Sequence, residues 1–111
     1  MDAEDLVDLL NDLEGVTASL DESKLGRLPA VWVRPIGLRR DTLAGDWTER
    51  VQLRLLASDK DPKRNRTGLR DLFDTITTTV DPDDDPAYAT VVRPSTGQPV
   101  PALVFPVDLL P

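Results

Sequence analysis

The feature that most constrains the fold of this chain is an alternating run from Trp47 to Ala57, WTERVQLRLLA. Every second residue of the run is apolar except Glu49, and the residues between them are mostly polar or basic. Because successive side chains of a strand point to opposite faces, the pattern predicts a long, half-buried β-strand. The face opposite the apolar one, which we expect to be wet or in contact with a neighbour, carries Arg50, Gln52 and Arg54.

Two amphipathic segments predict helices, one on either side of this strand in the sequence. In residues 2–14 the leucines fall at i, i+3, i+4 and i+7, with Asp2 as a candidate N-cap and Gly15 as the residue after the C-cap. A second helix is expected to start at Asp61-Pro62 and to end before Asp81-Pro82, because proline fits the first helical turn and interrupts a helix elsewhere. Gly68 weakens a helix, so an alternative start of its regular part lies nearer Thr67.

Shorter apolar runs predict four further strands, within residues 16–20, 29–34, 88–92 and 101–107. Pro35 and Gly37 are expected to end the second of these, which leaves residues 36–46 as a large, apolar and basic tip between two strands. The segment DESKLGRL at 21–28 is polar and is expected to be a loop. Pro106 cannot donate to a ladder, so the last strand is expected at a sheet edge or at its frayed end.

The predicted order is α-β-β-β-α-β-β, which favours an α+β fold in a single domain covering residues 1–111. We expect a mixed or antiparallel sheet of about five strands, with both helices on one face because each has one apolar stripe. The expected core is Leu6, Leu9, Leu10, Leu13, Val51, Leu53, Leu55, Leu69, Leu72, Phe73 and Ile76.

Composition removes most catalytic and metal chemistry. The 111 residues include neither cysteine nor histidine, so disulfides, thiolate sites and the usual general base near neutral pH are excluded. The carboxylates of 81–85 lack the calcium-loop spacing, and a solvated loop is the favoured interpretation. We therefore expect a non-enzymatic protein with no cofactor and no metal. An acidic N-terminus and the lack of a long apolar run predict a protein folded in a cytoplasm, without a membrane span.

Charge is segregated along the chain, whose net charge is −7. Residues 1–22 carry eight acidic groups and no basic one, 24–70 carry a net of +7, and 71–111 carry a net of −6. The segregation is either ordinary solvated surface or complementary faces that meet between subunits. DNA binding is less favoured, because the chain is acidic and few aromatics are interleaved with the basic residues. The candidate interface residues are Arg39, Arg40, Arg50, Arg54, Lys63, Arg64, Arg66, Asp71, Asp74, Asp83, Asp84 and Asp85, with Lys60 as a further basic candidate.

The chain resembles the small tail-terminator, or tail-completion, proteins of long-tailed bacteriophages, especially those of actinobacterial hosts. The resemblance covers nearly the whole chain and lies in the order of the elements and in their local sequence. It rests on the segments LVDLLNDLEGV, LPAVWVRPIGLRRDTLAG, VQLRLLASDKD, LRDLFDTITTTV and PALVFPV.

This resemblance implies an α/β sheet with two helices, assembled as a homohexameric ring. Such a ring caps the finished tail tube, stops its polymerisation and presents a surface to the connector of the head. The implied partners are the tail-tube protein and the head-closure or connector protein, with no sequence-specific nucleic acid, although DNA could pass through the lumen. The implied location is the head–tail junction of the virion, after assembly in the host cytoplasm.

Two alternatives stay open. One is another protein of the phage neck; head-closure proteins tend to be small β-barrels, which two helices argue against, and adaptors are mostly helical, which five strands argue against. The other is a cytoplasmic, non-enzymatic protein-binding module. A gene position just before the major tail-tube gene would distinguish a tail terminator from these alternatives.

Overall fold

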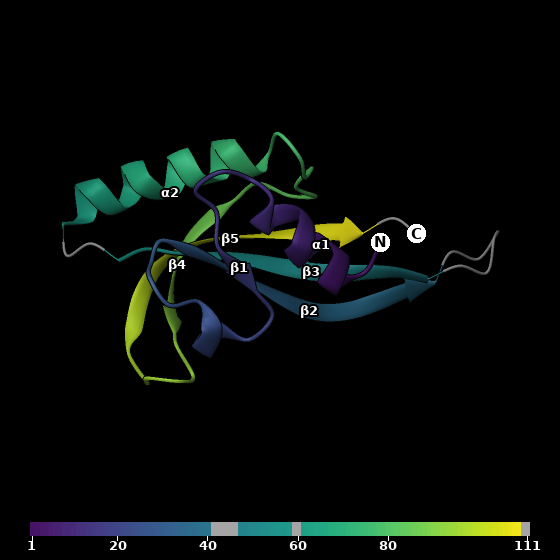
Figure 1. The fold of residues 1–111 in the computed structure, drawn as a ribbon, viewed down its shortest axis with the longest axis horizontal. Coiled ribbons are helices and arrows are strands. Elements are labelled where there is room, and N and C mark those ends of the chain that lie inside the picture. The colour runs from purple at the N-terminus through teal and green to yellow at the C-terminus, as the bar shows by residue number, and fades with distance from the viewer. Residues whose placement is uncertain (41–46, 59–60, 110–111) are drawn as a thin grey trace.

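The strand predicted from Trp47 to Ala57 is the central strand of a five-stranded sheet in the computed structural model, which describes residues 1–40, 47–58 and 61–109 (Figure 1). The strands are β1 (Ala18–Ser19), β2 (Ala30–Arg40), β3 (Trp47–Leu56), β4 (Ala87–Val92) and β5 (Pro99–Leu109). Their order across the sheet is β1-β2-β3-β5-β4; β1 is parallel to β2, and all other neighbours are antiparallel. The predicted α+β fold with a mixed sheet is confirmed.

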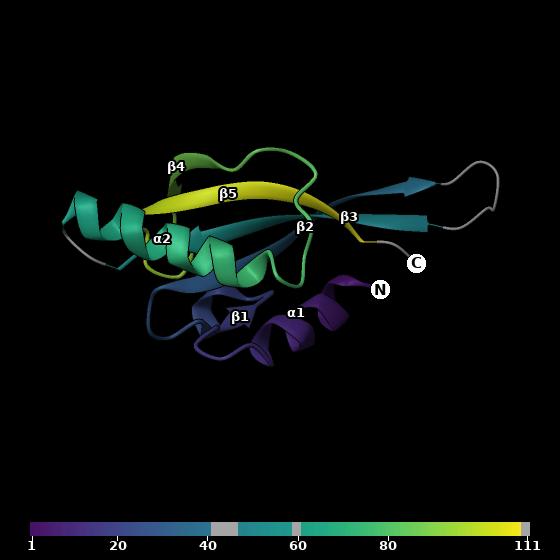
Figure 2. The same ribbon diagram turned by 90° about the horizontal axis from the view of Figure 1, so that it is seen from above.

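Both helices, α1 (Ala3–Asn11) and α2 (Pro62–Ile76), contribute to a core on the same face of the sheet (Figure 2). Their starts are as predicted. Asp2 accepts a hydrogen bond from the Asp5 amide at 2.8 Å, and Asp61 accepts one from the Lys63 amide at 3.0 Å. These caps satisfy amide groups that a helix leaves unpaired in its first turn.

The first helix is shorter than predicted, because Asn11 turns the chain back toward the sheet. Its side-chain amide donates to the Ala18 carbonyl at 3.0 Å, and its side-chain oxygen accepts from the Ala18 amide at 2.8 Å. Gly15 has the positive φ (+77°) expected for the turn after a helix. Asn11 therefore positions β1 beside α1 while Gly15 allows the reversal between them.

The main core lies between the helices and the sheet. Phe105 is fully buried and meets Phe73 edge to face, with ring centroids 5.1 Å apart. Of the predicted core, Leu9, Leu13 and Phe73 are only partly buried. The remaining predicted residues are buried, namely Leu6, Leu10, Val51, Leu53, Leu55, Leu69, Leu72 and Ile76.

A second, smaller core lies on the opposite face of the sheet and was not predicted. The loop expected at 21–28 contains a short 3-10 helix, η1 (Glu22–Lys24), and folds over one end of this face. Leu25 is buried there against a group of small and aliphatic side chains. That group is Ala30, Leu56, Val91 and Ala102. The face carrying Arg50, Gln52 and Arg54 is therefore covered at one end rather than wet throughout.

Two predictions about prolines differ from the structure, the one at Pro35 and, in part, the one at Pro106. The β2 strand does not end at Pro35. It continues to Arg40 after a register shift between Pro35 and Gly37, so residues 36–40 belong to a strand and not to the predicted tip. The rest of the predicted tip, residues 41–46, lies outside the described residues. The β5 strand, which contains Pro106, lies inside the sheet and not at its edge.

Pro106 is tolerated in β5 because its nitrogen faces a position that β4 does not reach. The Pro106 carbonyl accepts from the Asp83 amide at 2.9 Å, and the last β4 pair is Ala87 with Val104. Pro101 follows the same rule on the other side, where β3 has ended and the Ala57 amide donates to the Pro101 carbonyl at 2.9 Å. A proline needs only a locally open edge, not an edge strand.

Candidate functional site

An exposed part of the described sheet is a two-stranded ribbon, formed by residues 36–40 of β2 and 47–50 of β3 (Figure 2). It projects along the long axis of the molecule, away from α2. Three of its side chains are large, apolar and about half or more exposed: Ile36 at 48%, Leu38 at 63% and Trp47 at 56%. Solvent-exposed apolar groups gathered on a projecting ribbon are typical of a contact surface.

Charge accompanies the apolar side chains of the ribbon. The Arg40 guanidinium lies 5.8 Å from the centroid of the Trp47 ring, within the range of a cation–π contact. At the base of the ribbon the Glu49 carboxylate accepts a hydrogen bond from the Ala3 amide at 2.8 Å. This bond explains why a carboxylate interrupts the apolar face of β3, since it holds the first turn of α1 against the ribbon.

A cluster of two carboxyl groups and two guanidinium groups lies beside the ribbon. Asp108 of β5 is 3.8 Å from both Arg39 and Arg50, and its Oδ1 is buried and accepts no hydrogen bond within the described part of the chain. The neighbouring carboxyl group of Asp108, together with burial, raises the pKa of Asp83, against the opposing effect of Arg50. The cluster joins the loop after α2, the end of β5 and the ribbon.

A groove of about 670 Å³ opens at the same end of the molecule. Its lining combines apolar side chains of α1 and β5 with the charged cluster, including Leu6, Leu9, Arg39, Asp83, Asp108 and Leu109. A carboxyl pair can move protons when a substrate reaches it. Here the two cations beside Asp108 balance the carboxyl charges, which suits a structural or docking role. Among the described residues, no group of three or more acidic side chains is placed to hold a metal ion.

Arg54 lies apart from this cluster, on the face of the sheet opposite the helices. Its guanidinium is 4.8 Å from the centroid of the Trp32 ring, and its Nε donates to Gln52 at 2.7 Å. Burial and the neighbouring charge of Arg34 lower the pKa of Arg54. Arg54 therefore already has contacts inside its own chain, although it is only half-buried.

The remaining candidate residues lie on α2 and the loop after it. Lys63, Arg64 and Arg66 are exposed on the first half of the helix, at the opposite end of the molecule from the ribbon (Figure 1). Arg64 is 3.9 Å from Asp61. The exposed carboxylates follow on the second half and beyond, at Asp71, Asp74, Asp83, Asp84 and Asp85.

This charge order is the reverse of what the helix dipole favours. A helix prefers acidic groups near its N-terminus and basic groups near its C-terminus. The first turn of α2 contains no acidic residue and its last turn no basic one. The order therefore does not serve helix stability, and it gives the molecule a basic end and an acidic surface.

Among the described residues, the structure thus brings Arg39, Arg50 and Asp83 of the predicted interface together and adds Asp108 to them, while Arg40 lines the same groove. Arg54 and the charges of α2 form separate surfaces, and Lys60 lies outside the described residues. Sequence reasoning missed Asp108 because it is an isolated acid in an apolar strand, far along the chain from its partners.

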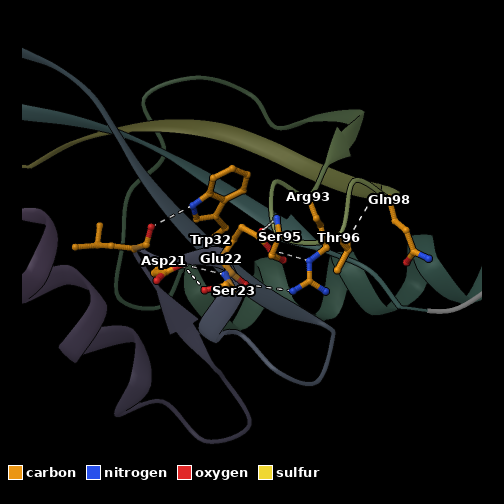
Figure 3. A network of polar contacts seen from close by, with 9 residues as sticks. Asp21, Glu22, Ser23, Trp32, Arg93, Ser95, Thr96 and Gln98 are labelled. Atoms are coloured by element: carbon orange, nitrogen blue, oxygen red, sulfur yellow. Dashed lines mark hydrogen bonds and ion pairs between the residues drawn. The ribbon is translucent and has the colours of Figure 1, made fainter.

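Another missed interaction links η1 to the turn between β4 and β5 (Figure 3). The Arg93 Nε donates to the buried carboxylate of Glu22 at 2.8 Å, and Arg93 Nη2 donates to the Glu22 carbonyl at 3.2 Å. The Ser95 amide donates to the same carboxylate. Burial acts to raise the pKa of Glu22, but the bonds from Ser95 and Arg93 outweigh it and leave that pKa below its usual value.

The comparisons with known proteins give no family for this chain: no protein-family model, curated protein or solved structure matches it. In the described residues, no helix is both long and apolar enough to cross a membrane.

Proposed function

We propose that this chain is a structural subunit of a bacteriophage virion, of the tail-terminator kind that its sequence resembles. Copies of it assemble into a ring of six, in which each subunit contacts its two neighbours through different surfaces. The ring caps the tail tube, ends tube polymerisation and joins the tail to the head connector. The protein carries out no catalysis in this role and uses no cofactor. DNA crosses the junction through the lumen of the ring without sequence-specific contacts.

The observation that carries the proposal is the ribbon. A two-stranded ribbon gains little stability alone in water. The exposed apolar side chains of Leu38 and Trp47 also forgo the free energy that their burial would provide. Burial against a neighbouring protein accounts for both the projection and its composition. An aromatic anchor beside an arginine is also a composition typical of protein interfaces.

The charge layout supports a head-to-tail ring. In a cyclic ring each subunit offers one surface to one neighbour and a different surface to the other. The basic first half of α2 and the basic ribbon provide surfaces of one sign, while Asp71, Asp74 and the Asp83–Asp85 loop provide the other. The mixed sheet with two helices also fits a terminator better than a head-closure barrel or a helical adaptor.

The test is electron microscopy of particles made without this protein. We expect heads without tails, together with tails that are uncapped or overlong. Normal, infectious, full-length particles would refute the proposal. A free chain that is not a ring in dilute solution would be no evidence against it, because the ring can form on the end of the tube.

A sharper version complements those particles with variants of the ribbon. Leu38→Ser combined with Trp47→Ser should leave the chain folded, since both side chains are exposed, but should not restore tailed particles. Arg54→Glu should also fail to restore tailed particles if Arg54 contacts a neighbouring subunit. Restored particles would mean that Arg54 has no role in that contact. Arg27→Glu, at an exposed loop position away from the ribbon, is the control and should restore them.

A further inference from the structure

The outer edge of β4 is the least protected strand edge in the described sheet. Exposed edges are usually blunted by charges, prolines, bulges or very short strands. The other edge has such devices: β1 has two residues, and β2 beyond it carries Pro35, a register shift and exposed arginines. The β4 sequence, AYATVV, has no charged residue and no proline, and all of it except Val91 is exposed.

The backbone groups that face outward can be identified from the ladder. The Arg93 amide donates to the Gln98 carbonyl, which places Arg93 in a hydrogen-bonded pair with β5. Because amide directions alternate along a strand, Ala89 and Val91 also face β5, opposite Ala102 and Val100. The amides and carbonyls of Tyr88, Thr90 and Val92 therefore face away from the sheet.

We infer that two copies of this chain pair antiparallel through their β4 edges, about a two-fold axis at Thr90, to form one continuous sheet. In this register Thr90 pairs with Thr90 of the second copy, and Tyr88 pairs with Val92. The three outward residues of each copy then exchange all their amide and carbonyl groups.

Side-chain chemistry supports a second copy as the occupant of this edge. Aromatic with β-branched, and threonine with threonine, are favourable cross-strand pairs. Tyr88 and Val92 are 55% and 59% exposed, so they are available for such pairs. Pro86 and Pro94 lie at the two ends of the ladder, opposite each other across the axis, where neither has an amide to leave unpaired.

Charge also permits the pairing despite the net charge of −7. The two-fold axis places the acidic loop of each copy, Asp83–Asp85, beside the uncharged turn of the other, Ser95–Gly97. The two acidic loops lie at opposite ends of the ladder and do not face each other. The ribbon is a poorer partner for β4, because the outer edge of β2 has a proline and a register shift.

This inference does not rest on the proposed ring, because an isologous contact closes with two copies and needs no other surface. It describes the free protein before it joins any assembly. The particle experiment tests the ring, and the solution mass of the purified chain tests this pairing, so either can fail alone.

The experiment is sedimentation analysis of the full chain from micromolar to millimolar concentration. We expect a monomer–dimer equilibrium between the chain mass of 12.2 kDa and twice that mass. Thr90→Lys puts like charges opposite each other and should weaken association about 10-fold or more. Ser58→Lys adds the same charge at an exposed site outside the strands and should associate as the unmodified chain does.

Mixing the Thr90→Lys chain with a Thr90→Glu chain identifies the symmetry. A two-fold contact at Thr90 places the two new charges opposite each other, so the mixture should form a heterodimer. A monomeric natural chain at millimolar concentration, undiminished association of Thr90→Lys, or a mixture that stays monomeric would each overturn the pairing.

Amide exchange checks the register in the natural chain. Protection that rises with protein concentration should appear at the amides of Tyr88, Thr90 and Val92. The amides of Ala89 and Val91 should be protected at every concentration, because they already bond to β5. Concentration-dependent protection elsewhere, without change at Thr90, would place the contact on another surface and contradict the inference.

Discussion

The two halves of the β2–β3 pair use the same backbone ladder in opposite surroundings. Pairing runs from Ala30 with Leu56 to Arg40 with Trp47, with one register shift. In the half next to the body, Val33 is fully buried opposite Leu53. In the distal half, every β2 residue from Arg34 onward is exposed.

The difference shows that backbone hydrogen bonds do not by themselves explain where large apolar side chains lie. The body half gains stability from burial between the sheet and the helices. The distal half has a ladder but no cover, and still carries Leu38 and Trp47. Apolar residues in the first region stabilise the fold, while those in the second are available to a partner.

The largest expected effect comes from truncating the body half. Leu53→Ala or Phe73→Ala should lower the free energy of unfolding by about 2–5 kcal/mol, with Phe73→Ala at the lower end because Phe73 is only partly buried. Urea denaturation measures the change. Losses below about 1 kcal/mol for both variants would show that the core was placed wrongly.

A smaller effect is expected at the buried ion pair that holds η1 against the β4–β5 turn. Glu22→Gln should cost about 1–3 kcal/mol, because it removes the charge that Arg93 and Ser95 stabilise. The pKa of Glu22 is lowered in the folded chain, so its contribution is present above the unfolded value near 4.5 and is lost as pH falls through the folded value.

Melting temperatures measured across this acid range should therefore converge for Glu22→Gln and the natural chain. Glu14→Gln, at an exposed position, is the matched control and should follow the natural chain at every pH. A constant difference between Glu22→Gln and the natural chain down to the lowest pH would mean that the carboxylate charge does not contribute.

A still smaller effect, of the opposite sign, is expected beside the ribbon. The raised pKa of Asp83 means that the folded chain binds its proton more tightly than the unfolded chain, so ionisation costs stability as pH rises through that value. Asp83→Asn should raise stability slightly near neutral pH, by a few tenths of a kcal/mol given its exposure.

The gain from Asp83→Asn should disappear once pH falls below the range in which Asp83 ionises. Asp85→Asn, in the same exposed loop, provides the comparison. Equal pH profiles for the two variants would remove Asp83 from the cluster around Asp108.

A comparably small effect on stability is expected in the distal half itself. Leu38→Ala removes the same side chain as Leu53→Ala from the same pair of strands, yet should change the free energy of unfolding by less than about 0.5 kcal/mol. Urea denaturation of the two variants side by side gives the contrast directly. A loss at Leu38 close to that at Leu53 would mean that the ribbon is part of the folded core.

Local patterns were enough to predict most of the fold. Alternation identified β3, leucine spacing identified α1, and Asp61-Pro62 marked the start of α2. These features depend on residues a few positions apart, so one sequence contains them. The single-sided packing of the helices followed from their single apolar stripes.

What could not be predicted depends on residues distant in sequence. Leu25 is one leucine in a polar loop and has no periodicity to mark it as buried. Glu22 and Arg93 form their ion pair only when the fold brings η1 against the β4–β5 turn. At the candidate site, Arg39, Arg50 and Asp83 were each predicted as interface residues, but not as one cluster. The cluster needs Asp108, which the register of β5 places opposite Arg50.

The prolines of β5 have a consequence for how the chain finds its strand register. Pro101 faces β3 just beyond the last pair, Leu56 with Ala102. If β5 slipped by two residues so that Pro101 stood opposite Leu55, the side-chain pattern would be preserved, but the Leu55 carbonyl would meet a nitrogen without hydrogen. A buried carbonyl left without a donor costs about 1–3 kcal/mol. Pro101 thus disfavours a sheet shifted by two residues, which the hydrophobic alternation alone would not distinguish from the native register.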